Sequence, residues 1–376
     1  MSEAFIISAV RTPIGVGKPG GALQPFAPVE LAALVIQEAV RRAEIDPGRI
    51  DDVIWGVVTP VGDQGANLGR LAVLKAGFPF KVPAVTLNRM CGSGQQAVHF
   101  AAQAILAGDM DLVIAGGTEC MSHQPLGADY PATWPDLPYN LVHQGISAEM
   151  MAEKWQQDRE TLDEYAYQSH LRAMHAIQNG YFDSQILPVT RPDGRTVTVD
   201  EGVRMPPDRQ KMAMLKPAFK PEGVTTAGNA SQISDAAAAI LLASPTAIGK
   251  HNLVPRARIV ARTVVGSNPV LMLDGPIPAT QQVLKKAGLS LDEIDVIEIN
   301  EAFASVVLAW EHEFQPDLSR VNPNGGAIAH GHPVGATGTI LMVKLLNELE
   351  RIGGRYGLQT MCIGHGMATA TILERI

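Results

Sequence analysis

Short apolar runs alternate with helix-like segments along the first 118 residues of the chain. The apolar runs predict four strands, at Ala4–Val10, Val53–Val58, 83–88 and Leu112–Ala115. Between them, apolar residues at helical spacing predict helices at Pro28–Arg42, Ala66–Ala76 and Gln95–Leu106. Strands that are apolar on both faces and alternate with helices are typical of a mostly parallel sheet covered on both sides. The expected fold class is therefore α/β.

The pattern changes in the middle of the chain. Residues 120–232 hold ten of the 26 prolines and half of the 14 methionines, with few strand-like runs. Helices are predicted at Ser147–Gln157 and Thr161–Asn179. Near Ser234 the α/β pattern returns and continues to the end. The middle segment is therefore interpreted as an insertion.

An internal repeat supports this division. The run Arg42–Asp51 resembles Lys286–Asp295 at an offset of 244 residues, and Leu112–Gly117 corresponds to Leu358–Gly364 about 246 residues later. Two matches in the same order predict a duplicated α/β half. The expected domains are residues 1–119 plus 241–266 for the first half, 120–240 for the insertion and 267–376 for the second half.

Composition excludes several classes of function. The formal net charge of −8 argues against a nucleic-acid-binding surface. Three widely spaced cysteines do not make a disulfide framework, which favours a reducing compartment. No basic leader, transit segment or apolar run of transmembrane length is visible. We expect a cytoplasmic protein with no membrane insertion and no nucleic-acid partner.

Candidate chemistry begins at Cys91, which lies where a predicted strand meets a predicted helix. Unpaired N–H groups and the dipole of a helix N-terminus favour a thiolate and any oxyanion formed beside it. Gly92 and Gly94 leave the backbone open to close approach by a substrate. A lone cysteine is more often an inert core residue, so the case depends on partners elsewhere in the chain.

Three later segments offer such partners. Asn300-Glu-Ala-Phe303 follows the apolar run Val296–Ile299, and Asn324–Gly338 contains His330 and His332 before a predicted helix. Met361–Gly366 follows a short predicted strand and contains Cys362. Strand ends and helix starts are where α/β folds place ligands. Either histidine could activate a thiol, and a second cysteine could exchange protons.

These four segments resemble the active-site loops of the thiolase family. The matching motifs are C-x-S-G at Cys91, N-E-A-F at Asn300, G-H-P at His332 and C-x-G at Cys362. Arg11-Thr-Pro13, Gly116–Glu119, Ala227–Ser231 and Gly275–Pro278 are also similar, and all occur in family order. The resemblance implies a duplicated αβαβα five-layer fold with an inserted loop domain.

The resemblance also implies roles. Cys91 would be the nucleophile that is acylated, and His332 would activate it and help to form one oxyanion hole. Asn300 would hold the water that completes that hole. Cys362 would exchange the α-proton of acetyl-CoA. The N–H groups of Cys91 and Gly364 would form the other oxyanion hole.

Coenzyme A (CoA) is the implied substrate, with no permanently bound cofactor. Positions that match the family's adenine and pantetheine contacts are Arg204, Leu215, Phe219, Ala227 and Ser231. His143 and Met272 match residues beside the pantetheine end and the acyl site. The segment Arg204–Lys220 carries five basic residues against one acid, which is usually a solvated surface but could also bind the CoA phosphates.

The sequence departs from the family pattern at three places. His365 stands where glycine is common, and Gln144 where methionine is common. Both departures bear on acyl preference. The stretch from Ser122 to His143 is short compared with tetrameric relatives. A homodimer is expected, with a dimer of dimers as the alternative.

The expected reaction interconverts a 3-ketoacyl-CoA plus CoA with a shortened acyl-CoA plus acetyl-CoA. It is reversible and ping-pong, through acyl-Cys91. An acetyltransferase that makes acetoacetyl-CoA is the alternative, because both directions use the same groups.

Other classes of function are less consistent with the sequence. Cys362-x-x-His365 and His330-x-His332 have metal-ligand spacings but no acidic partner, so no metal is expected. Gly15-x-Gly-x-x-Gly20 fits a dinucleotide fingerprint, but nearby prolines prevent a helix there. A decarboxylating ketosynthase would carry a second histidine in place of Cys362. A non-enzymatic binding protein would not need four reactive motifs.

Overall fold

A single ten-stranded sheet organises the computed structural model, which describes residues 3–376. Its strands follow the order β10-β11-β12-β9-β1-β8-β5-β3-β4, with β2 paired to β8. Their bounds are β1 Phe5–Arg11, β2 Gly15–Val16, β3 Asp52–Gly56, β4 Ala84–Leu87, β5 Leu112–Cys120, β8 Ser234–Ala243, β9 Ala257–Gly266, β10 Val296–Ile299, β11 Tyr356–Ile363 and β12 Met367–Arg375. A separate hairpin pairs β6 (Val189–Thr190) with β7 (Thr196–Val197).

The sheet is mixed, so the prediction of a mostly parallel sheet is wrong. Strand β3 is parallel to β4 and β5, and β10 is parallel to β11. The other neighbours in the order pair antiparallel. Strand β8 is buried at every residue although both of its long neighbours run antiparallel to it. A continuous apolar run indicates that both faces of a strand are buried, but it does not indicate the direction of the strand.

The first five helices match the predicted ones to within about three residues at each end, and the later helices had no predicted bounds. The helices of residues 3–376 follow in chain order. Their bounds are α1 Pro28–Arg42, α2 Leu68–Lys75, α3 Ser93–Ala107, α4 Gln144–Lys154, α5 Arg159–Gln178, α6 Arg209–Ala213, α7 Pro245–His251, α8 Pro276–Ala287, α9 Ala304–Phe314, α10 Ala327–His330 and α11 Val334–Ile352. The observed starts of α2 and α4 differ from the predicted ones because capping side chains set them, and apolar periodicity does not reveal caps. The side chain of Asn67 caps α2 by accepting from the N–H of Arg70, and that of His143 caps α4 by accepting from the N–H of Gly145.

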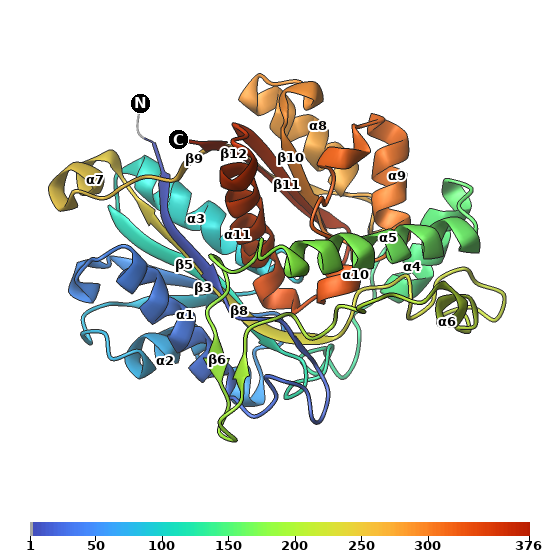
Figure 1. Cartoon of the computed structure of the whole chain (residues 1–376), viewed down its shortest axis with the longest axis horizontal. Helices are drawn as coiled ribbons and strands as arrows, with labels where there is room; N and C mark the ends of the chain where they lie inside the picture. The colour runs from blue at the N-terminus through green and yellow to red at the C-terminus, as the bar shows by residue number, and fades with distance from the viewer. Residues whose placement is uncertain (1–2) are drawn as a thin grey trace.

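Helices α3 and α11 lie in the middle of the molecule, between the two halves of the sheet (Figure 1). Helix α11 is buried from Val334 to Leu349, because it contacts strands of both halves. Helices α1 and α2 cover the outer face of the first half, and α8 and α9 cover that of the second. The result is the predicted five-layer order of helices, sheet, helices, sheet and helices.

The two halves repeat the same strand order. Strands β3-β5-β8-β1 of the first half correspond to β10-β11-β12-β9 of the second, with the same directions. The parallel partner β4 of the first half corresponds to a single bridge between Ile297 and Val321. Short 3-10 turns at Pro47–Arg49 and Leu291–Glu293 lie 291 − 47 = 244 residues apart, the offset found in the sequence.

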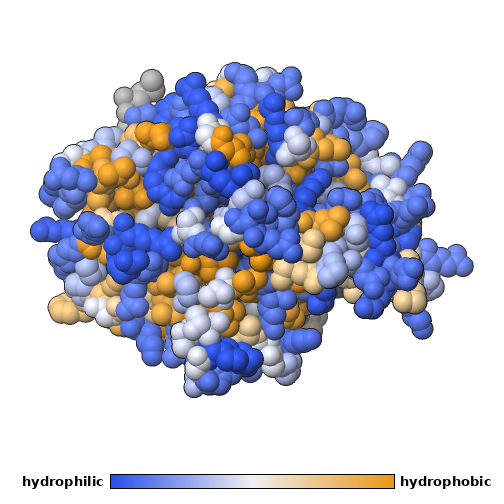
Figure 2. Space-filling model, in the orientation of Figure 1, coloured by the Kyte–Doolittle hydropathy of each residue, from blue (hydrophilic) through white to orange (hydrophobic). Residues whose placement is uncertain are grey.

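Residues between β5 and β8 form an additional region beside the sheet. It contains α4, α5, α6 and the small hairpin. Figure 1 shows the three helices toward the right of the molecule and the hairpin, labelled β6, at the bottom. Figure 2 shows a surface of mostly hydrophilic residues in which apolar residues form separate clusters. Within residues 3–376 no helix has the length and apolarity that a membrane span requires.

Candidate active site

Cys91 occupies the tight connection between β4 and α3, two residues before the helix begins. Met90 adopts a positive φ of 46°, and the Ser93 hydroxyl fixes the turn. Ser93 Oγ donates a hydrogen bond to the Met90 carbonyl at 2.6 Å and accepts one from the Arg89 N–H at 2.9 Å. Cys91 is buried in a cluster of apolar residues that includes Val334 at the start of α11 and Ile363 at the end of β11. The predicted strand-to-helix junction is confirmed.

The N-terminal turns of α3 and α11 pack directly against each other through glycines. A Cβ on Gly94 would lie 2.6 Å from Thr339 Oγ1 and 2.9 Å from the Gly335 carbonyl oxygen. Such distances leave no room for a side chain. Cys91 and His332, which precede these two turns, are therefore brought together from opposite halves of the chain.

Burial dominates the electrostatics of the Cys91 thiol. Burial raises the pKa of Cys91 to about 11. Hydrogen bonds from the backbone N–H groups of Gly364 and Cys91 and from the Gln144 side chain lower this pKa, but by less. Glu119 raises it further. The sequence predicted a stabilised thiolate from the helix N-terminus alone. In the structure the N–H groups of Cys91 and of Gly364, which lies outside the helix, bond the thiol, but the cost of burying a charge is larger.

Cys362 lies inside β11, one residue before its end, and not after the strand as predicted. Its side chain is buried, and burial together with the nearby Cys91 raises its pKa well above the ordinary value for a thiol. The influence of Cys91 on Cys362 places the two thiols in one electrostatic site, although 271 residues (362 − 91) separate them.

His332 is held as a neutral imidazole with a defined tautomer. Its Nδ1 lies 2.7 Å from Thr337 Oγ1, whose own hydrogen is donated to the Pro333 carbonyl at 2.9 Å. Nδ1 must therefore carry the proton, and Nε2 presents a lone pair. Burial lowers the pKa of His332 to about 4. An imidazole in this state can accept a proton at Nε2.

Asn300 lies beside His332 at the end of β10. Its Nδ2 is 3.4 Å from His332 Nε2, and its Oδ1 is buried without a hydrogen-bond partner among residues 3–376. The next residue, Glu301, anchors this loop by accepting hydrogen bonds from the Ser169 hydroxyl and the Ile328 N–H. An unpartnered buried oxygen is expected to bind a water molecule or a ligand group.

His330, the other candidate base, faces away from the thiols. Its Nδ1 lies 2.8 Å from Asp200 Oδ2, and Asp200 forms a buried ion pair with Arg11. Its Nε2 is 2.9 Å from the Asn324 carbonyl. The ring therefore connects the inserted segment to the core, and His332 is the histidine that remains available to Cys91.

Glu119, the last residue of the motif Gly116–Glu119, organises the site. Its buried carboxylate accepts hydrogen bonds from the N–H groups of Val58, Thr59 and Gly335 and from the Gln64 side chain. One of these donors belongs to the first turn of α11. A charged residue at the end of a buried strand is the signal that could have identified it.

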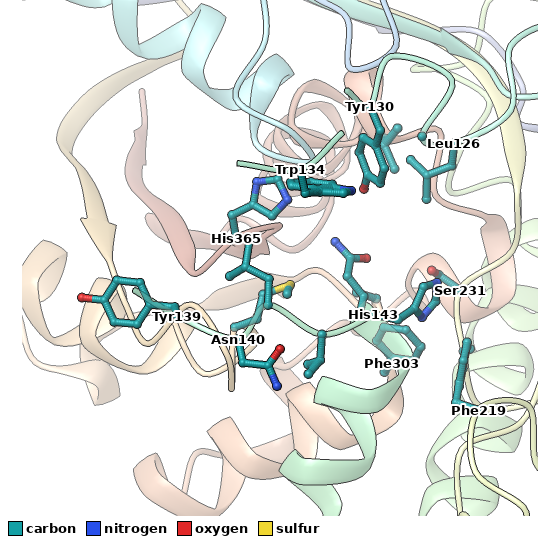
Figure 3. Close-up of a pocket in the computed structure, with 18 of the residues that line it drawn as sticks. Leu126, Tyr130, Trp134, Tyr139, Asn140, His143, Phe219, Ser231, Phe303 and His365 are labelled. Carbon is teal, nitrogen blue, oxygen red and sulfur yellow. The ribbon is translucent and has the colours of Figure 1, made fainter. Parts of the chain in front are cut away.

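A cavity of about 1060 Å³ opens above this cluster. His332, Gln144 and His365 line it, together with residues of the inserted region (Figure 3). Of the predicted CoA contacts, His143, Phe219, Ser231 and Met272 also line it. Arg204, Leu215 and Ala227 do not, and all three are exposed. A Cβ on Gly228, beside Ala227, would meet Leu215, so these two lie together outside the cavity.

The basic segment is largely neutralised, by two acids from other elements and by its own Asp208. Arg209 pairs with Glu164, Lys211 with Asp208, and Lys220 with Glu153. Arg204 and Lys216 have no ion pair among residues 3–376. Within the same residues no group of three or more His, Cys, Asp and Glu side chains could hold a metal ion.

Comparison with known proteins places this geometry in a family. Residues 4–246 match the family model "Thiolase, N-terminal domain" and residues 253–375 match "Thiolase, C-terminal domain". A steroid 3-ketoacyl-CoA thiolase of Mycobacterium tuberculosis is 49% identical, over 100% of this chain and 95% of that protein. A beta-ketoadipyl-CoA thiolase of Acinetobacter baylyi is 42% identical over 100% of both chains.

A solved structure agrees with these matches. The crystal structure of the Bacillus anthracis acetyl-CoA acetyltransferase superposes with a TM-score of 0.93 at 39% identity, covering 100% of this chain and 99% of that one. Both family models together span nearly the whole sequence, and the fold agrees over its full length. The chain therefore belongs to the thiolase family.

Proposed function

We propose that this protein is a CoA-dependent acyltransferase that interconverts a 3-ketoacyl-CoA plus CoA with a shortened acyl-CoA plus acetyl-CoA. The observation that carries the proposal is a set of buried contacts beside one cavity. Cys91 acts electrostatically on Cys362, and Asn300 lies 3.4 Å from His332. His332 lines the cavity, and so does Gln144, which hydrogen-bonds the Cys91 thiol. The names of its relatives, which are thiolases and an acetyltransferase, support the same chemistry.

In the cleavage direction Cys91 would begin the reaction. Its thiol proton passes to His332 Nε2 as the sulfur attacks the 3-keto carbon. The bond between carbons 2 and 3 then breaks, and its electron pair leaves with the acetyl-CoA fragment. That fragment takes a proton from the Cys362 thiol and departs as acetyl-CoA. The acyl group stays on Cys91.

The second half-reaction restores the enzyme. A CoA thiol gives its proton to the Cys362 thiolate and attacks the acyl carbonyl of acyl-Cys91. The Cys91 sulfur leaves and recovers its proton from His332. The N–H of Gly364, which already hydrogen-bonds the thiol, is positioned to stabilise the carbonyl oxygen in both steps, and one such donor typically contributes about 10²–10³ in rate.

This reaction is tested by supplying CoA together with 3-ketoacyl-CoA esters and following the formation of acetyl-CoA. Supplying acetyl-CoA alone and following acetoacetyl-CoA tests the biosynthetic alternative. Production of acetyl-CoA that persists in Cys91→Ala would contradict the proposed mechanism. No turnover of any ester in the unmodified protein would contradict the proposed function.

We further propose that the nucleotide end of CoA binds outside the cavity, near Arg204 and Lys216. Within residues 3–376 these two basic residues form no ion pair, whereas the neighbouring ones are already paired. Arg204→Ala is expected to raise the KM for a CoA thioester more than for the matching pantetheine thioester, which lacks the phosphates. The control is Arg209→Ala, which removes a charge paired with Glu164. Equal effects on both thioesters would exclude a phosphate or adenine contact.

A homodimer is proposed from the free edge of the sheet at β4. Phe80 is 86% exposed beside this strand, and Leu71, Leu74 and Val85 are also exposed apolar residues of the same region. An apolar edge strand is a surface that proteins usually cover. Light scattering should give a dimer mass that falls in Phe80→Asp. Val254→Asp, at an exposed apolar residue of another loop, should keep it.

A further inference from the structure

We propose, on the basis of the function above, that the acyl group is bulky, cyclic or branched, and apolar. It would pack on a wall formed by Tyr130, Trp134 and His365, here called the aromatic wall. All three residues line the cavity. Figure 3 shows Tyr130, Trp134 and Leu126 on one side of it, opposite His143, Phe219 and Phe303.

The rings of the aromatic wall contact one another edge to face. The Tyr130 and Trp134 centroids are 5.4 Å apart, and those of Trp134 and His365 are 5.8 Å apart. Such contacts fix the orientation of each ring and leave flat faces available for a further ring or a branched carbon skeleton. The wall is thus a prearranged surface for apolar groups.

The wall reaches the reacting sulfur. His365 directly follows Gly364, whose N–H hydrogen-bonds the Cys91 thiol. His365 adopts a φ of 65°, a conformation that residues other than glycine rarely adopt, at the turn between β11 and β12. Its ring contacts the Trp134 ring edge to face there. At the other end of the wall, burial raises the pKa of Tyr130, and a negative charge on Cys91 would raise it further. An acyl group on Cys91 would therefore start beside these rings.

The wall leaves much apolar surface uncovered. Tyr130 is 43% exposed, Trp134 47% and Leu126 45%, although each lines a cavity. Exposed aromatic surface inside a concave site favours an occupant that removes it from water. A short acetyl group beside Cys91 would leave most of this surface wet. The cavity of about 1060 Å³ lies slightly above the range of roughly 300–1,000 Å³ for small-molecule sites, which allows a larger acyl group.

The segment that carries the wall can adapt to its occupant. Residues 125–142 form hydrogen bonds only among themselves within residues 3–376, such as Tyr130 N–H to the Gly127 carbonyl. The segment is anchored at its two ends, where His123 bonds the Gln24 carbonyl and Asp63, and where His143 caps α4. Apolar contacts alone hold the part between, so it can move by small amounts without breaking hydrogen bonds.

Charge also selects the occupant. Residues 120–143 contain no Lys and no Arg, but they contain Asp129 and Asp136. Asp129 Oδ1 is buried without a hydrogen-bond partner among residues 3–376, and Asp136 lines the cavity. A carboxylate at the far end of a short acyl chain would meet the like charge of Asp136 here, and among residues 3–376 no Lys or Arg lines the cavity. The wall therefore disfavours acyl groups such as 3-oxoadipyl.

The test compares 3-ketoacyl-CoA esters in the cleavage assay. We expect kcat/KM for 3-cyclohexyl-3-oxopropanoyl-CoA to exceed that for the straight-chain ester of equal carbon number, and both to exceed that for 3-oxoadipyl-CoA. Trp134→Ala should lower kcat/KM for the cyclic ester about tenfold, because it removes the largest ring of the wall. The same variant should change acetoacetyl-CoA cleavage less than about twofold, since that acyl group is too short to cover the wall.

Two further variants control the experiment. Thr133→Ala alters the exposed neighbour of Trp134, which does not line the cavity, and should change neither substrate. His365→Gly keeps the local backbone favourable because glycine adopts positive φ readily, and it should reduce the preference for the cyclic ester. A straight-chain preference in the unmodified enzyme would overturn the inference, and so would equal losses for all esters in Trp134→Ala. Failure to cleave any ester would instead overturn the proposed function.

Discussion

The starts of the two central helices occupy equivalent places in the two halves, but they carry different chemistry. Cys91 lies two residues before α3 and His332 lies two residues before α11. Each loop is fixed by a hydroxyl from its own helix. Ser93 bonds the backbone before Cys91, whereas Thr337 bonds the ring of His332 itself. The duplication thus supplies two helix starts, and the side chains decide which becomes the nucleophile and which the base.

Burial acts on these two groups in opposite directions. It raises the pKa of Cys91 to about 11 and lowers the pKa of His332 to about 4, so both are neutral at pH 7. A neutral thiol beside a neutral imidazole avoids two buried charges before substrate arrives. The N–H groups that face the sulfur then stabilise the charge that develops during attack. The two halves therefore differ in protonation before attack: the Cys91 sulfur holds a proton, and His332 Nε2 is free to accept it. Each prediction below tests either the thiol or the imidazole.

The largest effect is expected from Cys91→Ala. Loss of the nucleophile should reduce kcat at least about 10³-fold and abolish the acetyl mass that acetyl-CoA adds to the protein. Mass spectrometry measures the adduct. Cys120→Ala, at another buried cysteine of the same half, should keep it. An unchanged adduct in Cys91→Ala would place the nucleophile elsewhere.

Cys362→Ala should separate the two half-reactions. By the repeat offset of 246, Cys362 corresponds to Gly116, so only the second half supplies this thiol. The variant should still acylate at Cys91 but should lose about 10²–10⁴-fold in making or breaking the carbon–carbon bond. Adduct formation and condensation are measured on the same sample. Equal losses in both would indicate a structural role instead.

Thr337→Val should impair the base side. It removes the acceptor that keeps the proton of His332 on Nδ1, which leaves a buried N–H unpaired and permits the other tautomer. We expect kcat to fall about tenfold or more, with KM nearly unchanged. Thr337→Ser retains the hydroxyl and should retain most of the activity. A matching loss in Thr337→Ser would mean that packing, and not the hydrogen bond, matters.

The smallest effect is expected on the thiol side, from Gln144→Leu. The side-chain hydrogen bond of Gln144 lowers the pKa of Cys91, so its removal should raise that pKa further. At a fixed pH of about 8, less thiolate is present, and alkylation of Cys91 by iodoacetamide should slow several-fold. The pH profile of alkylation should shift upward, whereas Gln168→Leu on α5 should leave it in place. A downward shift of the alkylation profile in Gln144→Leu would contradict a hydrogen bond from Gln144 that stabilises the Cys91 thiolate.

Local patterns determined much of the molecule. Apolar periodicity located the helices and strands, because burial of a face repeats along each element, and the repeat of 244 residues revealed the two halves. The four motifs located Cys91, Asn300, His332 and Cys362, because tight glycine-rich turns at strand ends are visible in sequence. Strand direction was not determined, since β8 is apolar on both faces in an antiparallel setting just as it would be in a parallel one.

Only the tertiary structure decided how these groups behave. The choice between His330 and His332 depended on Asp200, which lies 130 residues away from His330 in sequence (330 − 200) and pairs with it. The pKa of Cys91 depended on burial by residues from α11 and β11, which outweighs the local helix N-terminus. The neutralised basic segment and the aromatic wall likewise join residues far apart in sequence. Desolvation, ion pairing and ring contacts act through space, so a linear pattern names the groups but not their protonation or their neighbours.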